Sequence, residues 1–138
     1  KQSIALMFGI LICGGIFIGF MNPPEPFDLQ TFLFQLFIPS ISEELVYRGC
    51  LFFLFLSAFN GTRGVILSGI LVTFWFSIIH GVGSHNGEIQ FDAISLIVTA
   101  LVGTILMLLR VISKSLMLPI AGHSIYNLCI QLVAVLQS

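Results

Sequence analysis

Charged residues are scarce in this sequence. Only 8% of its 138 residues are Asp, Glu, Lys or Arg, whereas soluble domains contain about 25%. The net charge of −1 provides no basic surface and argues against a nucleic-acid partner. Hydrophobic residues instead make up 57% of the chain, and the mean hydropathy is +1.10. This composition indicates an integral membrane protein whose main surroundings are a lipid bilayer.

Cysteine is also rare and follows no recognisable pattern. Cys13, Cys50 and Cys129 lie in apolar stretches, and none of them forms a CxxC pair. We therefore expect them to be small, buried, apolar residues. The chain begins with Lys1 rather than Met, which is compatible with part of a longer protein.

The apolar residues form five long segments. A spanning helix needs about 20 such residues. The polar breaks between the segments include a proline-rich stretch, NPPEPFD, a turn, NGTRG, and a polar loop at 81–92. We expect an all-α, polytopic transmembrane bundle of about five spanning helices, forming a single membrane domain over 1–138. The segments are 4–21, 29–59, 65–81, 93–110 and 117–137.

The few charges alternate in sign from one break to the next. The positive-inside rule predicts that the N-terminus and both basic turns are cytoplasmic and that the C-terminus is outside. The basic residues are Lys1, Arg63, Arg110 and Lys114, and the acidic residues of the other breaks are Glu25, Asp28, Glu88 and Asp92.

The first segment contains a GxxxG pattern, Gly15 to Gly19. Such a pattern lets a second helix approach closely. Glycine is also frequent in membrane helices, so an ordinary occurrence is an equally good interpretation.

The stretch SEELVYRG, Ser42 to Gly49, places three charges inside the second apolar segment. Each charge near the bilayer centre costs at least ~2.5 kcal/mol, so each needs a partner, water or a function. Glu44 and Arg48 are four residues apart and can pair along a helix. Glu43 points about 100° away, toward another neighbour. The alternative is a structural ion pair with a second glutamate that reaches toward the interface.

His80 ends the third segment, which forms a hairpin with the second. Glu43 precedes Asn60 by 17 residues and His80 follows Gly64 by 16, so both lie roughly 25 Å from the turn. We expect them to face each other. The same count puts His123 only about 12 Å beyond the Arg110/Lys114 turn, so the second and third helices would need to extend toward the cytoplasm.

The fifth segment contributes His123 and Asn127, which are four residues apart and share a helix face. Polar groups from three spans thus enter the apolar layer, which indicates an internal site. A carboxylate beside an imidazole can activate water, and a second His and an Asn can stabilise an oxyanion. Glu43, His80 and His123 are also a possible zinc set, although no HExxH helix is present. The sequence has no G-x-S-x-G elbow, and its cysteines have no evident base.

Three ordered motifs resemble those of the CAAX-protease and bacteriocin-processing family, also called the Abi family. They are EExxxR (Glu43, Glu44, Arg48), FxxxH (Phe76, His80) and HxxxN (His123, Asn127), and the resemblance covers about 35–130. It implies a helical intramembrane endopeptidase with a cavity open to lipid.

Carried over from that family, Glu43 is the base, His80 is its partner, and His123 and Asn127 are the oxyanion donors. Glu44 and Arg48 support the helix and tune the site. The implied substrate is a peptide or protein that enters from the membrane, such as a prenylated CAAX-type peptide, and no metal or other cofactor is expected.

Two alternatives remain open at this point. One is a zinc-dependent membrane protease that uses Glu43, His80 and His123 as ligands. The other is a non-catalytic membrane scaffold or bacteriocin-immunity protein with the same fold. The expected location is a bacterial cytoplasmic membrane.

Overall fold

A computed structural model describes residues 1–24, 26–85 and 87–138, except for the side chain of His85. Glu25, one of the predicted acidic loop residues, lies outside the described residues. The elements are α1 (Gln2–Met21), α2 (Leu29–Glu44), the π-helix η1 (Leu45–Leu51), α3 (Phe52–Ala58), α4 (Gly61–Gly81), β1 (Val82–His85), β2 (Glu88–Phe91), α5 (Ala93–Ser113) and α6 (Met117–Leu136).

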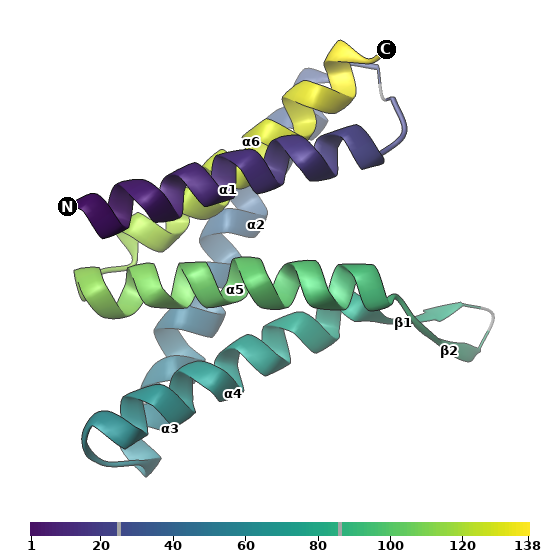
Figure 1. Ribbon diagram of the computed structural model, residues 1–138. Coiled ribbons are helices and arrows are strands. Elements are labelled where there is room, and N and C mark those ends of the chain that lie inside the picture. The colour runs from purple at the N-terminus through teal and green to yellow at the C-terminus, as the bar shows by residue number, and fades with distance from the viewer. Residues whose placement is uncertain (25, 86) are drawn as a thin grey trace.

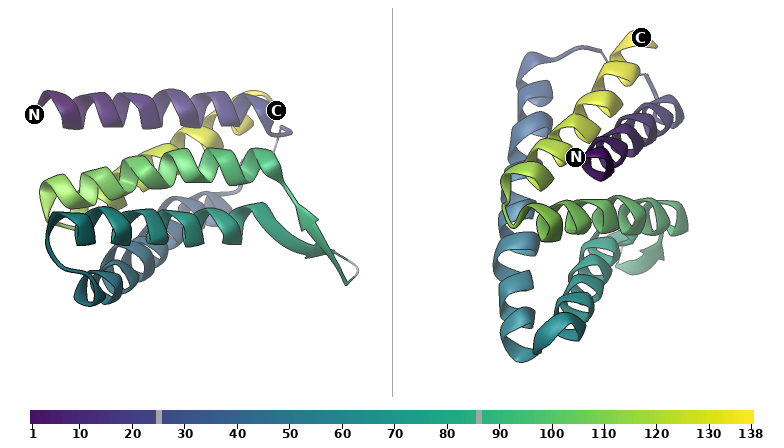
Figure 2. Two further views of the ribbon diagram at one scale, coloured as in Figure 1. Left: turned by 60° about the horizontal axis from the view of Figure 1, so that its bottom comes forward. Right: turned by 60° about the vertical axis from the view of Figure 1, so that its left-hand side comes forward.

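The helical bundle confirms the predicted all-α membrane fold. Four helices, α1, α4, α5 and α6, are long and apolar enough to cross a bilayer. The remaining predicted segment, 29–59, forms one continuous helical rod, in which α2, η1 and α3 follow each other without a break. Figures 1 and 2 show that this rod crosses α5 at a steep angle, whereas its first part, α2, runs alongside α6.

The first helix packs along the last one, and two glycines permit their close approach. A methyl group on Gly15 would lie 2.6 Å from the carbonyl oxygen of Tyr126, and one on Gly19 would lie 2.7 Å from the Cβ of Val133. Both separations are too short for a side chain at either glycine. The GxxxG pattern therefore forms a helix–helix contact, which confirms the first of its two interpretations.

The predicted polar loop after α4 is a β-hairpin. β1 pairs with β2 in antiparallel register, from Val82 opposite Phe91 to His85 opposite Glu88. Asp92 then begins α5 as its N-cap, since its carboxylate accepts hydrogen bonds from the backbone N–H groups of Ile94 and Ser95, at 3.0 Å each.

The polar connections gather at the two ends of the bundle. The N-terminus, the α3–α4 turn and the α5–α6 turn lie at one end, whereas the hairpin and the C-terminus lie at the other (Figures 1 and 2). The predicted basic turns therefore share one end. Large apolar side chains are exposed on every helix, as contact with lipid requires, for example Phe17, Phe53, Ile70 and Leu101.

The expectation that the cysteines are buried is wrong. Cys13 and Cys50 are exposed, and Cys129 is half-buried. In a bilayer an exposed position on a helix meets lipid, so an apolar stretch does not by itself indicate the protein core.

Candidate active site

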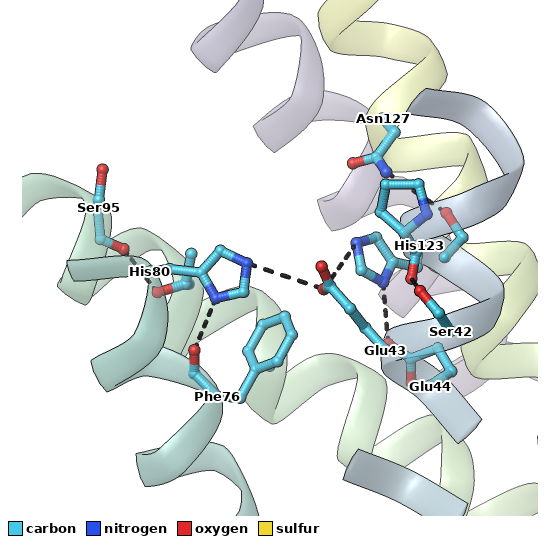
Figure 3. A network of polar contacts seen from close by, with 12 residues as sticks. Ser42, Glu43, Glu44, Phe76, His80, Ser95, His123 and Asn127 are labelled. Carbon is cyan, nitrogen blue, oxygen red and sulfur yellow. Dashed lines mark hydrogen bonds and ion pairs between the residues drawn. The ribbon is translucent and has the colours of Figure 1, made fainter. Parts of the chain in front are cut away.

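The predicted site residues come from three parts of the bundle that are distant in the sequence. Glu43 and Glu44 end α2, and Arg48 follows in η1. His80 lies in the last turn of α4, and His123 lies in α6. Figure 3 shows that the two imidazoles approach Glu43 from opposite sides.

One half of the site is closed. The Glu44 Oε1 atom accepts hydrogen bonds from Arg48 Nη1 at 3.0 Å and from His123 Nδ1 at 2.9 Å. The side chains of Glu44 and Arg48 are 0% exposed, and that of His123 is 8% exposed. The predicted i,i+4 ion pair is therefore confirmed, and it extends to a third residue.

Phe76 lies between the two halves and contacts both. The Arg48 guanidinium carbon lies 4.2 Å from the centre of its ring, at a cation–π distance. The rings of His80 and His123 are 4.6 Å and 6.2 Å from it. Its backbone carbonyl oxygen is 2.7 Å from His80 Nδ1. The FxxxH motif thus positions the histidine through the backbone as well as through the ring.

The other half of the site is open and contains Glu43. Its Oε2 atom lies 3.8 Å from His80 Nε2 and 4.0 Å from His123 Nε2. The side chains of Glu43 and His80 are 25% and 32% exposed. Glu43 Oε2 itself is shielded and has no hydrogen-bond partner among the described residues. The expected approach of Glu43 and His80 is confirmed as geometry.

The hydrogen bonds determine which ring nitrogens carry hydrogen. The Phe76 carbonyl can only accept, so His80 Nδ1 must donate to it. The Glu44 carboxylate likewise accepts from His123 Nδ1. When either ring is neutral, its Nε2 is therefore a free acceptor, and both of these atoms face Glu43 Oε2 (Figure 3).

Asn127 lies one turn beyond His123 on α6, but its amide nitrogen is directed at α2. Nδ2 lies 3.0 Å from the carbonyl oxygen of Gln35 and 3.4 Å from Ser40 Oγ. Its role as an oxyanion donor stays a prediction.

The π-helix is attached to α5 by two side chains. Arg48 Nη2 donates to the carbonyl oxygen of Gly103 at 3.2 Å, and Arg110 Nε donates to the carbonyl oxygen of Arg48 at 3.1 Å. A methyl group on Gly103 would lie 3.0 Å from the Phe76 ring and 3.2 Å from Arg48 Nη2. A larger residue at this position would push the guanidinium away.

Cavities lie outside this cluster. An apolar one of about 350 Å³ lies between α4 and α5 and is lined by residues such as Ile66, Thr73 and Met107. A polar one of about 250 Å³ is lined by Gln35, Asn127 and their neighbours. Asn127 therefore borders both the polar cavity and α2.

Glu43, His80 and His123 offer the kinds of ligand atom that zinc binds, but their spacing is wider than a zinc site requires. Two imidazole nitrogens and one carboxylate oxygen are suitable ligands, and each Nδ1–H is held by an acceptor, as in zinc sites. Their separations of 3.8 and 4.0 Å exceed the ~3.3 Å expected between tetrahedral ligands. In the described part of the chain, no three ligating side chains are close enough to hold a metal. The chemistry fits zinc, but the site would have to contract.

Sequence reasoning missed the supporting residues Gln35, Ser40, Gly103 and Arg110. Only one of these contacts has a sequence signal. Pro39 follows Gln35 by four residues within an apolar segment, and a proline there removes a helical hydrogen bond.

Comparison with known proteins identifies a family. The family model described as type II CAAX prenyl endopeptidase Rce1-like matches residues 25–129. The match spans most of the chain and includes every residue of the candidate site. No curated protein and no solved structure matches this chain.

Proposed function

The chain belongs to the Rce1-like family of type II CAAX prenyl endopeptidases, and we propose that it hydrolyses its substrate with a water activated by Glu43 and His80. The family is one of CAAX-type intramembrane endopeptidases, so this chain is an integral membrane protein of a protease family. The substrate that we propose is a membrane-associated or prenylated CAAX-type peptide.

One observation carries the water mechanism. The 3.8 Å between Glu43 Oε2 and His80 Nε2 is too long for a direct hydrogen bond, and it is a separation that one water oxygen at about 2.8 Å from each atom would bridge. Such a water donates one hydrogen to each acceptor and keeps a lone pair for the scissile carbonyl carbon. Glu43 takes the proton as oxygen bonds to carbon, and returns it to the leaving amine as the C–N bond breaks.

His123 is the oxyanion donor that we propose. Its Nδ1–H is already donated to Glu44, so Nε2 can donate only when the ring is an imidazolium. The carboxylates of Glu43 and Glu44 lie on either side of the ring, 4.0 Å from Nε2 and 2.9 Å from Nδ1.

The environments of the two glutamates support this assignment. Glu44 is fully buried, and its Oε1 atom is occupied by the two donors Arg48 and His123. Glu43 is the carboxylate that a substrate can reach. The open half of the site therefore performs the chemistry, and the closed half orients it.

Cleavage by purified protein in lipid nanodiscs tests the proposal. A fluorogenic, farnesylated CAAX-type peptide is the substrate, and Glu43→Gln should reduce kcat by roughly 10²–10⁴ while leaving the melting temperature nearly unchanged. Glu88→Gln is the matched control, because Glu88 lies on the exposed hairpin, and it should retain wild-type activity. Equal cleavage by Glu43→Gln and wild type would refute the mechanism, and no cleavage by wild type would favour the scaffold alternative.

A zinc-dependent protease is the second candidate, because both Nε2 acceptors converge on Glu43 Oε2. Bound zinc would supply Lewis-acid activation, with Glu43, His80 and His123 holding the ion. The glutamate mechanism predicts that activity survives exhaustive chelation. Stoichiometric zinc, with activity lost on its removal and restored on its return, would favour the metal alternative.

The cellular setting that we propose is a bacterial cytoplasmic membrane. The small helical core and the gathering of basic turns at one end support it. The bilayer and a peptide substrate are then the partners of this chain.

A further inference from the structure

The backbone of α2 lacks one hydrogen-bond donor just before the site. Pro39 lies inside this helix and has no N–H, so it cannot donate to the carbonyl of Gln35, four residues earlier. Gln35 and Asn127 line the same polar cavity, so a donor from α6 can reach this carbonyl. The side-chain amide of Asn127 replaces it, since Nδ2 lies 3.0 Å from the Gln35 oxygen.

The second contact of this amide is also on α2. Asn127 Nδ2 lies 3.4 Å from Ser40 Oγ, and the fully buried Ser40 hydroxyl donates to the carbonyl of Leu36 at 3.1 Å. An amide nitrogen carries two hydrogens. Both of its acceptors therefore belong to the turn of α2 that contains Pro39.

The position of this contact relates it to the active site. Glu43 lies four residues after Pro39 on α2, and His123 lies four residues before Asn127 on α6. The contact thus joins the two helices one turn away from the site on each of them. A displacement of α2 at this point would change the distances from Glu43 to both histidines.

We propose that Asn127 is a positioning residue, whose amide supplies the N–H that Pro39 lacks and thereby holds Glu43 against His80 and His123. That Asn127 positions a catalytic base rests on the proposed function. That its side-chain amide takes the place of the proline N–H rests on the geometry of the contact alone. The oxyanion role predicted from the sequence requires the same amide to point elsewhere.

A double-mutant cycle with Pro39→Ala separates the two roles. Alanine at 39 restores the backbone N–H, which can donate to Gln35 without help from α6. Asn127→Ala should lower the melting temperature by about 4–8 °C when residue 39 is proline, because a half-buried carbonyl loses its donor. The same substitution should have only a small effect in the Pro39→Ala background. Gln131→Ala is the matched control, because this amide borders the same cavity without a hydrogen bond in the described chain.

Activity is measured in the same four proteins, well below their melting temperatures. With proline at 39, Asn127→Ala should reduce kcat by roughly tenfold to 10²-fold and leave KM nearly unchanged, since a misplaced base slows the chemical step. With alanine at 39, most of this loss should disappear. If alanine at 39, which touches no substrate, restores activity, then the Asn127 amide acts by positioning Glu43.

Three results would overturn the inference. Equal melting losses in both backgrounds would show that the amide does not serve Pro39. Equal kcat losses of roughly 10²–10³ in both backgrounds would identify an oxyanion donor instead. Coupled melting temperatures with unchanged kcat per folded molecule would leave a structural contact only. If the wild-type protein cleaves no prenylated peptide, the proposed function fails, and the melting cycle still decides whether the amide replaces the proline N–H.

Discussion

Glu43 and Glu44 are neighbours in the sequence but have opposite environments. Successive residues of a helix point about 100° apart, so Glu44 turns toward Arg48 and His123 while Glu43 turns toward the open side. The sequence predicts this division from the i,i+4 spacing of Glu44 and Arg48. The shared contact with His123 could not be predicted, because it depends on how α6 packs against α2.

Arg48→Ala should strongly destabilise the fold. It removes the charge partner of a fully buried carboxylate, which costs about 3–5 kcal/mol, and it also removes the donor to the Gly103 carbonyl. Chemical unfolding in mild detergent measures the loss. Arg63→Ala is the control, since Arg63 is exposed and should change stability very little.

A companion variant distinguishes charge from packing. Glu44→Gln combined with Arg48→Met removes both charges and keeps similar volumes, so it should recover part of the stability lost in Arg48→Ala. If Arg48→Ala is as stable as Arg63→Ala, the buried pair is not a structural element of this fold.

At the scale of elements, two backbone irregularities flank the glutamates. Pro39 precedes them, and the π-helix η1 follows them. Each one presents a carbonyl to a side chain of another helix, Gln35 to Asn127 and Arg48 to Arg110. The proline is visible in the sequence, but the π-helix is not, because the residues of 45–51 also suit an ordinary α-helix. π-turns are frequent at functional sites.

Arg110→Met should destabilise the protein by about 1–3 kcal/mol. Methionine keeps an apolar stem but cannot donate to the carbonyl of Arg48, which then lacks this partner in an apolar region. Equilibrium unfolding measures the change. Lys114→Met removes a positive charge near the same turn and serves as the control. Equal effects of the two substitutions would show that charge at this end, and not the hydrogen bond, is responsible.

The N-cap of α5 gives a pH-dependent contribution to stability. Hydrogen bonds from the Ser95 side chain and backbone lower the pKa of Asp92 below its usual 3.8. A lowered carboxyl pKa stabilises the folded state fully above the unfolded pKa, and this gain is lost as pH falls through the folded value. The difference in melting temperature between wild type and Asp92→Asn should therefore shrink below about pH 4. A difference that stays constant down to pH 2 would contradict a role for the carboxylate.

The β-hairpin occupies residues whose composition predicts only a polar loop. Its sequence contains Asn86-Gly87 between two short stretches, a dipeptide typical of tight hairpin turns. The strands of four residues each are too short for a clear alternation of polar and apolar residues. The Asn-Gly dipeptide was therefore a better indication of the hairpin than the alternation of polar and apolar residues.

At the scale of the whole molecule, hydropathy was enough to locate every helix. The predicted segments agree with the helices to within a few residues at their ends. The depth of each site residue in the bilayer was harder to predict, because counting residues from a turn assumes that the helix axes are parallel. The rod of α2, η1 and α3 crosses α5 steeply, so distance along the rod does not measure depth (Figure 2). Because α2 lies alongside α6, Glu44 meets His123 although their residue counts from the turns differ.

The orientation of the bundle is the last prediction. Both basic turns lie at the same end as the N-terminus, and the positive-inside rule places that end in the cytoplasm. In a background without the native cysteines, Glu88→Cys in the hairpin should react with a membrane-impermeant maleimide in intact bacterial cells. Thr62→Cys, in the first turn of α4, should react only after the membrane is opened. Labelling of Thr62→Cys alone in intact cells would invert the topology and place the basic turns outside. The outcome also determines which side of the membrane the hairpin faces, and β1 of this hairpin begins at Val82, two residues after His80.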